Sequence, residues 1–189
     1  MNSDQDLDSA LQVLRNGGII LYPTDTIWGI GCDATNAEAV KKIYSLKQRE
    51  ETKSMLVLVE HPDRIARHVR EVPEMVWQLI EVNDKPMTII YPGAINFASN
   101  LVSADGTIGI RIANDEFCKK LIGKLNRPLV STSANISGQP APAIFDEISN
   151  EIKSGVDYIV KWRQDDVSKR SVSQIIKLSV NGEIQIIRS

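Results

Sequence analysis

Two basic side chains at neighbouring positions, Lys47 and Arg49, stand at the end of a predicted helix, and Lys53 follows on the next loop. A triphosphate carries several negative charges, and arginine can bind a phosphate through two hydrogen bonds at once. Such a group could therefore hold a nucleotide. Taken alone, however, a basic cluster is more often the solvated end of a helix.

Hydroxyl side chains gather near the ends of three predicted strands, which favours the ligand-binding interpretation. They are Thr24 and Thr26 after the strand at 19–22, Ser131 and Ser133 after the strand at 128–130, and Ser173 at the strand 173–178. Open α/β sheets bind ligands at the ends of their strands. Each hydroxyl alone is typical of a turn, but three such places beside a basic cluster indicate a cleft for a polar, anionic ligand.

A strand pattern places one further cation. Residues 107–112, TIGIRI, alternate between isoleucine and other side chains. Because successive side chains of a strand point to opposite faces, Thr107 and Arg111 share one face and the isoleucines share the other. We expect the isoleucines to pack in the core and Arg111 to lie in the cleft.

The spacing of apolar residues predicts the elements that position these side chains. Helical segments are expected at 7–14, after a capping box of Thr35 and Glu38, twice within 62–80, after a cap at Asn114, and at 143–152. Strands are expected at 19–22, 55–60, 86–91, 107–112, 128–130, 157–161, 173–178 and 183–188, the last two joined as a hairpin by Asn181-Gly182. Helices and strands alternate irregularly, which predicts an α/β fold with a mixed sheet.

Length and charge limit the class of protein. The chain has 189 residues, and we expect a single domain spanning 1–189 with its own core. Its net charge of -2 gives no general attraction to nucleic acid, so any basic site must be local. No apolar run approaches the ~20 residues that cross a bilayer, and the acidic start is unlike a signal peptide. These features predict a cytoplasmic protein without membrane contact.

No metal site is predicted from the chain's own side chains. Cys32 and Cys118 are far apart in apolar surroundings, so we interpret them as reduced core residues. His61 and His68 have no partners at the spacing of metal ligands.

One motif points to a different class of protein. Gly29, Gly31 and Ala34 fit the G-x-G-x-x-A pattern of dinucleotide-binding folds. The expected helix begins after this pattern rather than within it, so a bound pyrophosphate would lack its helix N-terminus, and we do not predict nicotinamide binding. P-loop, G-x-S-x-G and H-E-x-x-H motifs are absent, which argues against a P-loop ATPase, common hydrolases and zinc proteases.

Four segments together resemble a known family. They are YPTDTIWGIGCDA, AVKKIYSLKQR with the following Lys53, GTIGIRI, and PLVSTSANISG, and the resemblance extends over about residues 8–188. The chain is similar to the YrdC-like family of threonylcarbamoyl-adenylate synthases. The resemblance implies a twisted open α/β sheet with flanking helices around a large basic concave cleft.

The resemblance also implies a reaction and its participants. Members of this family make threonylcarbamoyl-AMP and pyrophosphate from L-threonine, bicarbonate and ATP, with Mg²⁺. The intermediate serves the threonylcarbamoyladenosine modification of tRNA, so partner proteins of tRNA modification are expected.

Site residues follow from the family's motifs by position. Lys47 and Arg49 match the K-x-R pair, and their implied role is catalytic. The implied ATP-binding residues are Lys47, Arg49, Lys53, Thr107, Ser133, Asn135, Ser173 and Arg188. The implied threonine-binding residues are Thr26, Arg111 and Ser131, with Arg111 pairing with the carboxylate.

Some positions depart from the family pattern. Glu50 stands where proline usually follows the K-x-R arginine, and Lys85 stands in place of a glycine. Near the C-terminus, Lys177 replaces an acidic residue. These departures concern the details of the nucleotide pocket.

Two rival functions stay open. The same fold could bind tRNA or double-stranded RNA without synthase activity, using Lys41, Lys42, Lys119, Lys120 and Lys124 along one face. Alternatively, the chain could be a YciO-like paralogue with another task. Such paralogues lack the intact K-x-R and S-x-N sets, whereas both are present here.

Overall fold

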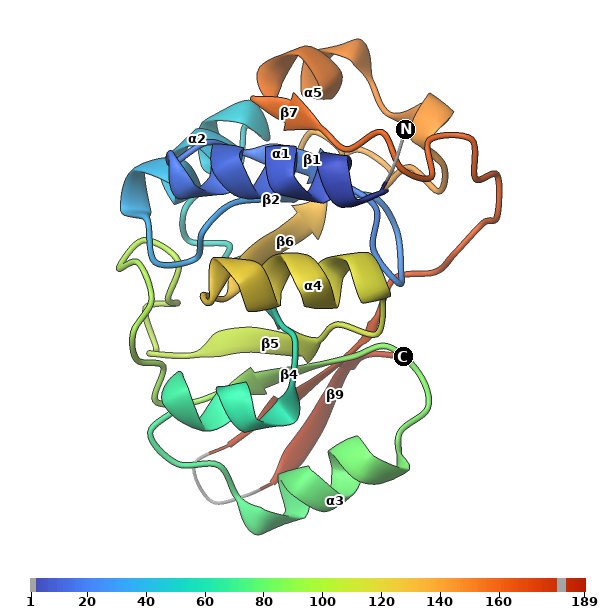
Figure 1. Cartoon of the computed structure of the whole chain (residues 1–189). Helices are drawn as coiled ribbons and strands as arrows, with labels where there is room; N and C mark the ends of the chain where they lie inside the picture. Colours follow the sequence, from blue (N-terminus) through green and yellow to red (C-terminus); the bar gives the residue numbers. More distant parts are fainter. Residues whose placement is uncertain (1–2, 180–182) are drawn as a thin grey trace.

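The computed structural model of the chain describes residues 3–179 and 183–189. Within these residues, nine strands form one open sheet in the order β7-β1-β2-β6-β3-β5-β4-β8-β9 (Figure 1). The strands are β1 (Ile20–Tyr22), β2 (Gly29–Gly31), β3 (Leu56–Val59), β4 (Met87–Tyr91), β5 (Ile108–Ile112), β6 (Leu129–Ser133), β7 (Tyr158–Ile159), β8 (Gln174–Leu178) and β9 (Ile184–Arg188). Parallel and antiparallel pairs occur side by side, so the predicted mixed α/β sheet is confirmed.

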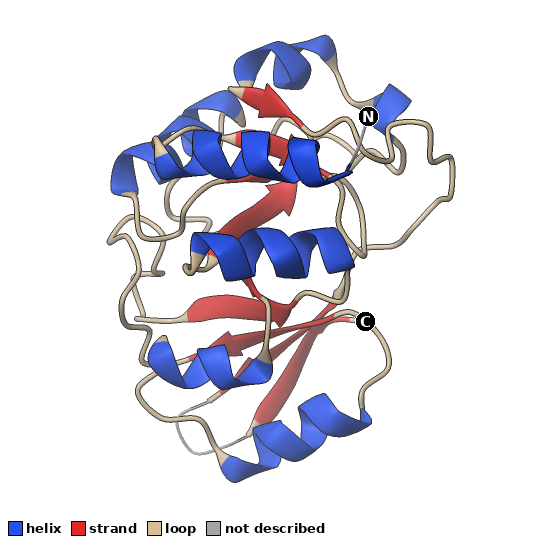
Figure 2. Cartoon of the chain, viewed as in Figure 1, coloured by secondary structure: helices blue, strands red, loops and turns tan. Residues whose placement is uncertain are grey.

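Helices flank this sheet (Figure 2). They are α1 (Ser3–Arg15), α2 (Ala37–Leu46), the 3-10 helix η1 (Pro62–Arg67), α3 (Glu74–Val82), α4 (Glu116–Leu125), the 3-10 helix η2 (Phe145–Glu147) and α5 (Asn150–Gly155). Helices α1 and α4 lie side by side across one face of the central strands (Figure 1). The helix expected at 143–152 is two short pieces, η2 and α5.

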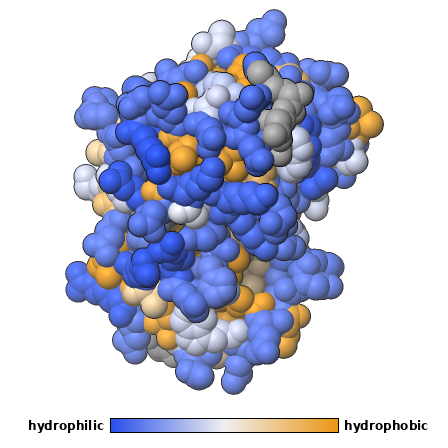
Figure 3. Space-filling model, viewed as in Figure 1, coloured by the Kyte–Doolittle hydropathy of each residue, from blue (hydrophilic) through white to orange (hydrophobic). Residues whose placement is uncertain are grey.

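Both faces of strand β1 are buried. Ile20 and Tyr22 of β1 belong to the apolar cluster that includes α1 and α4, whereas Leu21 belongs to a second cluster with α2. A slip of one residue would put Leu21 where Tyr22 packs, so the different shapes of the two close-packed clusters, rather than a polar face, fix the register. The outer surface seen in Figure 3 is mostly hydrophilic, with small hydrophobic areas between polar ones.

The helix caps are one residue away from the predicted ones. Asn36 caps α2, because its side chain accepts a hydrogen bond from the Ala39 amide at 3.1 Å. Thr35 is unsuited to this role because its hydroxyl donates to Asp33 Oδ1 at 2.7 Å. The predicted capping box is therefore wrong.

The predicted cap of α4 is also wrong by one position. Asp115, not Asn114, caps the helix by accepting from the Cys118 amide at 3.0 Å. The second carboxylate oxygen of Asp115 lies 3.1 Å from Arg163. This ion pair fixes the Asp115 side chain, which is the reason the cap forms there.

Strand β2 was not predicted, because its glycines carry no hydrophobic pattern. It pairs with both β1 and β6. A Cβ atom at Gly31 would lie 2.6 Å from the Val130 carbonyl oxygen and 2.7 Å from Tyr22, so glycine is required there. Gly29 and Gly31 are thus strand residues, not a phosphate-binding turn.

Two further expectations concern the C-terminal hairpin and the membrane. The Asn181-Gly182 turn lies outside the described residues, although β8 and β9 pair antiparallel as a hairpin would. No helix in the described part of the chain is long and apolar enough to cross a membrane.

The observed cap of α2 can be tested by substitution. Asn36→Ala should lower the free energy of unfolding by about 1 kcal/mol, because the Ala39 amide loses its acceptor. Glu38→Gln, which removes the charge of the predicted capping box, should change it by less than about 0.5 kcal/mol. Urea denaturation measures both. Equal losses for the two variants would mean that Glu38 caps the helix after all.

Candidate active site

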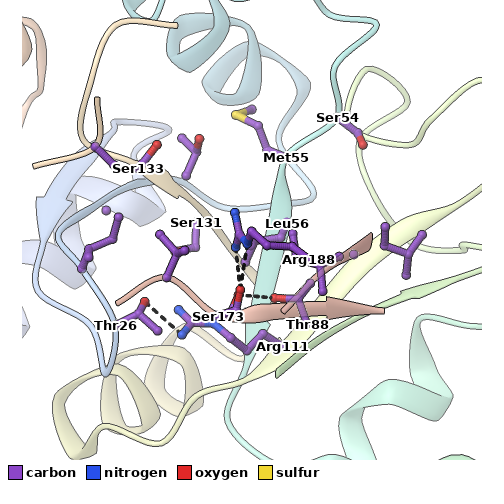
Figure 4. Close-up of a pocket in the computed structure, with 18 of the residues that line it drawn as sticks. Thr26, Ser54, Met55, Leu56, Thr88, Arg111, Ser131, Ser133, Ser173 and Arg188 are labelled. Atoms are coloured by element: carbon purple, nitrogen blue, oxygen red, sulfur yellow. Dashed lines mark hydrogen bonds between the residues drawn. The ribbon is translucent and has the colours of Figure 1, made fainter. Parts of the chain in front are cut away.

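One large cavity of about 720 Å³ opens on the face of β5 that carries Thr107, Gly109 and Arg111 (Figure 4). The alternation read from TIGIRI is therefore confirmed: Ile108 and Ile110 are buried in the core. The predicted site residues that line this cavity are Thr26, Arg49, Thr107, Arg111, Ser131, Ser133, Asn135, Ser173 and Arg188. They come from β5, β6 and β9, from the positions directly before β5 and β8, and from the loops that follow β1, α2 and β6.

The cavity is basic although the chain is not. Its described lining carries four cationic side chains, Arg49, Arg111, Lys177 and Arg188, and one carboxylate, Asp105. The whole chain has a net charge of -2. A concave, low-dielectric surface focuses the field of such charges, so this hollow attracts small anions.

Arg111 is held at the deep end of the cavity by the TDT corner (residues 24–26). Its Nη1 atom donates to Thr26 Oγ1 at 3.0 Å and lies 3.0 Å from Asp25 Oδ1. The Arg111 and Asp25 side chains are only 3% and 8% exposed. Since a buried charge requires a partner, Asp25 is what allows Arg111 to be buried here.

In the described part of the chain, the Nε atom of this arginine is buried without a hydrogen bond, as are both carboxylate oxygens of Asp25 beside it. Among the described residues, the buried Nε of Arg111 has no partner, whereas its Nη1 atom is occupied. Nearly all buried donors in proteins are paired, so this one calls for a partner beyond the described side chains, such as water or a ligand. A carboxylate accepts well from the edge of a guanidinium, and Thr26 and Ser131 place hydroxyls nearby (Figure 4).

The two C-terminal strands close another wall of the cavity. Arg188 of β9 donates to the Ser173 carbonyl oxygen from Nε at 3.0 Å and from Nη2 at 2.7 Å. The Ser173 hydroxyl lies 2.8 Å from the Thr88 hydroxyl. Burial, together with the charge of Arg111, lowers the pKa of Arg188. Arg111 and Arg188 therefore lie close enough for their charges to interact, and both line the cavity.

Arg49 reaches the cavity from the turn that ends α2. The chain reverses at Gln48, whose φ of 50° is left-handed. Arg49 then donates to the carbonyl oxygens of Lys53 at 2.6 Å and Ser54 at 2.9 Å. These contacts fix the guanidinium at the rim, and burial lowers its pKa.

Lys47 lies behind the cavity wall rather than on it. The residue is 1% exposed, and its Nζ donates to the carbonyl oxygens of Ser133 at 2.5 Å and Asn135 at 2.6 Å. Burial lowers the pKa of Lys47 to about 8, and the nearby Arg49 adds to the effect. Lys47 thus fastens the loop that carries the S-x-N residues of the cavity.

Lys53 is not part of the cavity lining. Its ammonium pairs with Glu50 at 3.4 Å on an exposed turn. Glu50 therefore neutralises Lys53 there, and neither residue lines the cavity.

Some lining and supporting residues were missed from the sequence. Thr88 lies between Met87 and Ile89 in the predicted strand PMTIIY, but Ile90 shares its face, so this strand has no clean alternation like that of TIGIRI. Asp25 and Asp105 had no periodic signal, because both stand in loops. Only the fold brings Asp25 to Arg111 and Asp105 to Lys177.

The hydrogen bonds from buried Lys47 to the Ser133 and Asn135 carbonyl oxygens predict that the stability difference between the wild type and Lys47→Met depends on pH. Lys47→Met leaves two carbonyl oxygens unpaired and should cost about 2 kcal/mol at pH 7. A lysine in the unfolded chain keeps its proton until a pH of about 10.4. Because the folded pKa of Lys47 is lower, about 8, the wild type should gain stability over Lys47→Met as pH rises through this window.

Urea unfolding of both proteins at neutral pH and at about pH 9.5 measures this difference, since the other titrating groups cancel between them. A difference that does not change with pH would contradict the buried, proton-releasing lysine.

Comparison with known proteins gives the family. The model of the family described as Sua5_yciO_yrdC, telomere recombination, matches residues 12–189. A relative from Pseudoalteromonas translucida, named threonylcarbamoyl-AMP synthase, is 27% identical over 187 residues, which cover 97% of this chain and 98% of the relative. A relative of the same name from Hahella chejuensis is 30% identical over 167 residues, which cover 87% and 90%.

Solved structures share the YrdC-like fold. E. coli YciO superposes with a TM-score of 0.85 at 21% identity, covering 100% of this chain and 90% of that one. P. abyssi Sua5 complexed with L-threonine superposes with a TM-score of 0.83 at 23% identity, covering 94% of this chain but only 52% of its own length. Since the family model covers nearly the whole sequence, the chain belongs to the Sua5/YciO/YrdC family.

Proposed function

We propose that the protein is a threonylcarbamoyl-AMP synthase, which makes threonylcarbamoyl-AMP and pyrophosphate from L-threonine, bicarbonate and ATP. The observation that carries this proposal is Arg111, whose buried Nε has no hydrogen-bond partner among the described residues, in a cavity rich in cations. Relatives at 27% and 30% identity bear the synthase name, which supports the same activity here.

The threonine site is proposed at the deep end of the cavity. Arg111 would bind the carboxylate through its free edge, while Asp25 and Thr26 hold the other side of the guanidinium. The hydroxyls of Thr26 and Ser131 would receive the polar groups of the amino acid. P. abyssi Sua5, whose fold is shared, has been solved with L-threonine bound.

ATP is proposed to occupy the rest of the cavity. The cavity volume of about 720 Å³ falls within the range of small-molecule sites. The lining residues proposed to bind ATP are Arg49, Thr107, Ser133, Asn135, Ser173 and Arg188. Lys47 would act from behind the wall, by holding the S-x-N loop and by its charge.

Magnesium is proposed to enter with the nucleotide. Mg²⁺ prefers carboxylate and phosphate oxygens, and the described cavity lining offers one carboxylate, Asp105, which is already paired with Lys177 at 2.9 Å. The lining therefore suits a MgATP substrate, in which the phosphates hold the ion, better than a metal held by the protein.

The proposed reaction needs positioning more than covalent help. The neutral amine of threonine attacks CO₂ and loses a proton to give a carbamate, or reacts with bicarbonate to give the same carbamate and water. A carbamate oxygen then attacks the α-phosphorus of ATP, and the bond to pyrophosphate breaks. Arg49 and the charge of Lys47 stabilise the departing pyrophosphate, while Arg111 holds the attacking amino acid in line.

The proposed product suggests where the protein acts and which proteins receive its adenylate. We propose one domain over residues 1–189 that acts in the cytoplasm and passes its adenylate to tRNA-modifying partner proteins. Direct RNA binding without chemistry is the weaker candidate. Of the lysines considered for it, Lys42 donates to the Gly17 carbonyl oxygen and Lys124 pairs with Asp8, so part of their charge is already engaged.

The activity is tested by incubating the protein with MgATP, labelled bicarbonate and L-threonine. We expect a labelled adenylate and pyrophosphate release that both require threonine. Arg111→Lys keeps the charge but loses the planar fork, so the KM for threonine should rise by about tenfold or more while the KM for ATP changes little. Arg15→Lys, at an exposed arginine on α1, is the matched control. Threonine-independent pyrophosphate release would reject the proposal.

Arg49 should matter for the phosphate step. Arg49→Gln removes a fixed cation at the cavity rim and should lower the rate of pyrophosphate release by about 10²-fold. Lys53→Gln is the comparison, because Lys53 pairs with Glu50 outside the cavity and should cost far less. Steady-state kinetics with saturating threonine measure both. Equal losses would mean that Lys53 moves onto the phosphates when ATP binds.

A further inference from the structure

We propose that Asp105, held in place by Lys177 and Thr107, binds the ribose hydroxyls of the nucleotide and so determines which sugar the site accepts. This inference rests on the proposed use of ATP. It concerns an acidic residue that departs from the basic character of the cavity and a lysine, Lys177, that departs from the family pattern.

The position of Asp105 in the cavity indicates where the nucleoside end of the nucleotide would lie. It is the one carboxylate among the described cavity-lining residues. A triphosphate is repelled by a carboxylate, so the phosphates belong beside the arginines. What remains of a nucleotide is the nucleoside, and its hydroxyl groups are hydrogen-bond donors that a carboxylate accepts.

The carboxylate is fixed but not saturated. Asp105 Oδ1 accepts from the Thr107 amide at 3.2 Å and from the Thr107 hydroxyl at 2.7 Å. Asp105 Oδ2 accepts from Lys177 Nζ at 2.9 Å. A carboxylate has about four acceptor positions, so these three donors leave room for a ligand hydroxyl. The Asp105 side chain is 52% exposed, so a ligand in the cavity can reach it.

The charge state suits this role. The hydrogen bonds from Thr107 and Lys177 lower the pKa of Asp105, so the group is an ionised acceptor at neutral pH. Lys177 also offsets its charge. Without Lys177, the carboxylate would repel the phosphates of the ligand that it is meant to hold.

Strand β5 supplies the correct distance. Thr107, which orients Asp105, and Arg111 are four residues apart on one strand face, which is about 13 Å. In the proposed product, about ten bonds join the threonine carboxylate carbon to a ribose hydroxyl, and an extended chain covers about 3.5 Å per three bonds, or roughly 12 Å. A single ligand can therefore reach both ends.

The experiment compares ATP with 2′-deoxy-ATP and 3′-deoxy-ATP by calorimetric titration of the wild type and Asp105→Asn. We expect the wild type to bind ATP about tenfold more tightly than at least one deoxy analogue, because a hydrogen bond to a charged group is lost. In Asp105→Asn, the preference should shrink to within about twofold. Asp8→Asn is the matched control, because Asp8 pairs with Lys124 at the same 2.9 Å, on the surface.

Each outcome bears on the inference. If Asp105 only ties Lys177 to the loop, the sugar preference will be the same in the wild type and in Asp105→Asn, and the inference is overturned. A wild type that binds all three nucleotides equally, or none, overturns it too. If Asp105→Asn does not fold, Asp105→Glu replaces it, with the same loss of preference expected because the carboxylate is displaced.

Failure of the proposed function has a different signature. The wild type would then discriminate between ATP and its deoxy analogues in binding, yet form no threonine-dependent adenylate. Conversely, an active enzyme without sugar discrimination would leave the synthase assignment intact and remove only the role of Asp105.

Discussion

The buried ion pair between Arg111 and Asp25 constrains the whole site. A guanidinium that is 3% exposed is tolerable only with a carboxylate at 3.0 Å, and breaking such a pair leaves an uncompensated buried charge. The pair joins β5 to the TDT corner after β1, two segments that are distant both in sequence and in the order of the sheet. The deep end of the cavity therefore has a defined shape before any ligand arrives.

Periodic signals in the sequence were sufficient for much of the fold and for part of the site. The alternation in TIGIRI placed Thr107 and Arg111 on the cavity face because strand geometry leaves no other choice. The hydroxyls of Thr26, Ser131 and Ser133 were found because they stand at the ends of apolar runs, and the structure brings them to the same cavity. Ser131 and Ser133 do not follow the strand, as was predicted, but lie within β6, which extends to Ser133.

Contacts that involve segments without a hydrophobic pattern could not be predicted from the sequence. Strand β2 was missed because Gly29 and Gly31 have no side chains to alternate, and only the close packing of Gly31 against Tyr22 and Val130 reveals why glycine is needed there. The burial of Lys47 was missed for a related reason. A lysine at a helix end looks solvated until the carbonyl oxygens of a distant loop are brought to it.

The crowding of like charges has a practical consequence. Burial lowers the pKa values of Arg188 and Lys47, and the charges of Arg111 and Arg49 lower them further, so like charges repel one another in the cavity and behind its wall. Any small anion that settles there relieves this repulsion and, by mass action, stabilises the folded chain. Sulfate, phosphate or citrate in a purification buffer would thus raise the melting temperature and compete with substrates, so the solvent in which this protein is studied becomes one of its ligands.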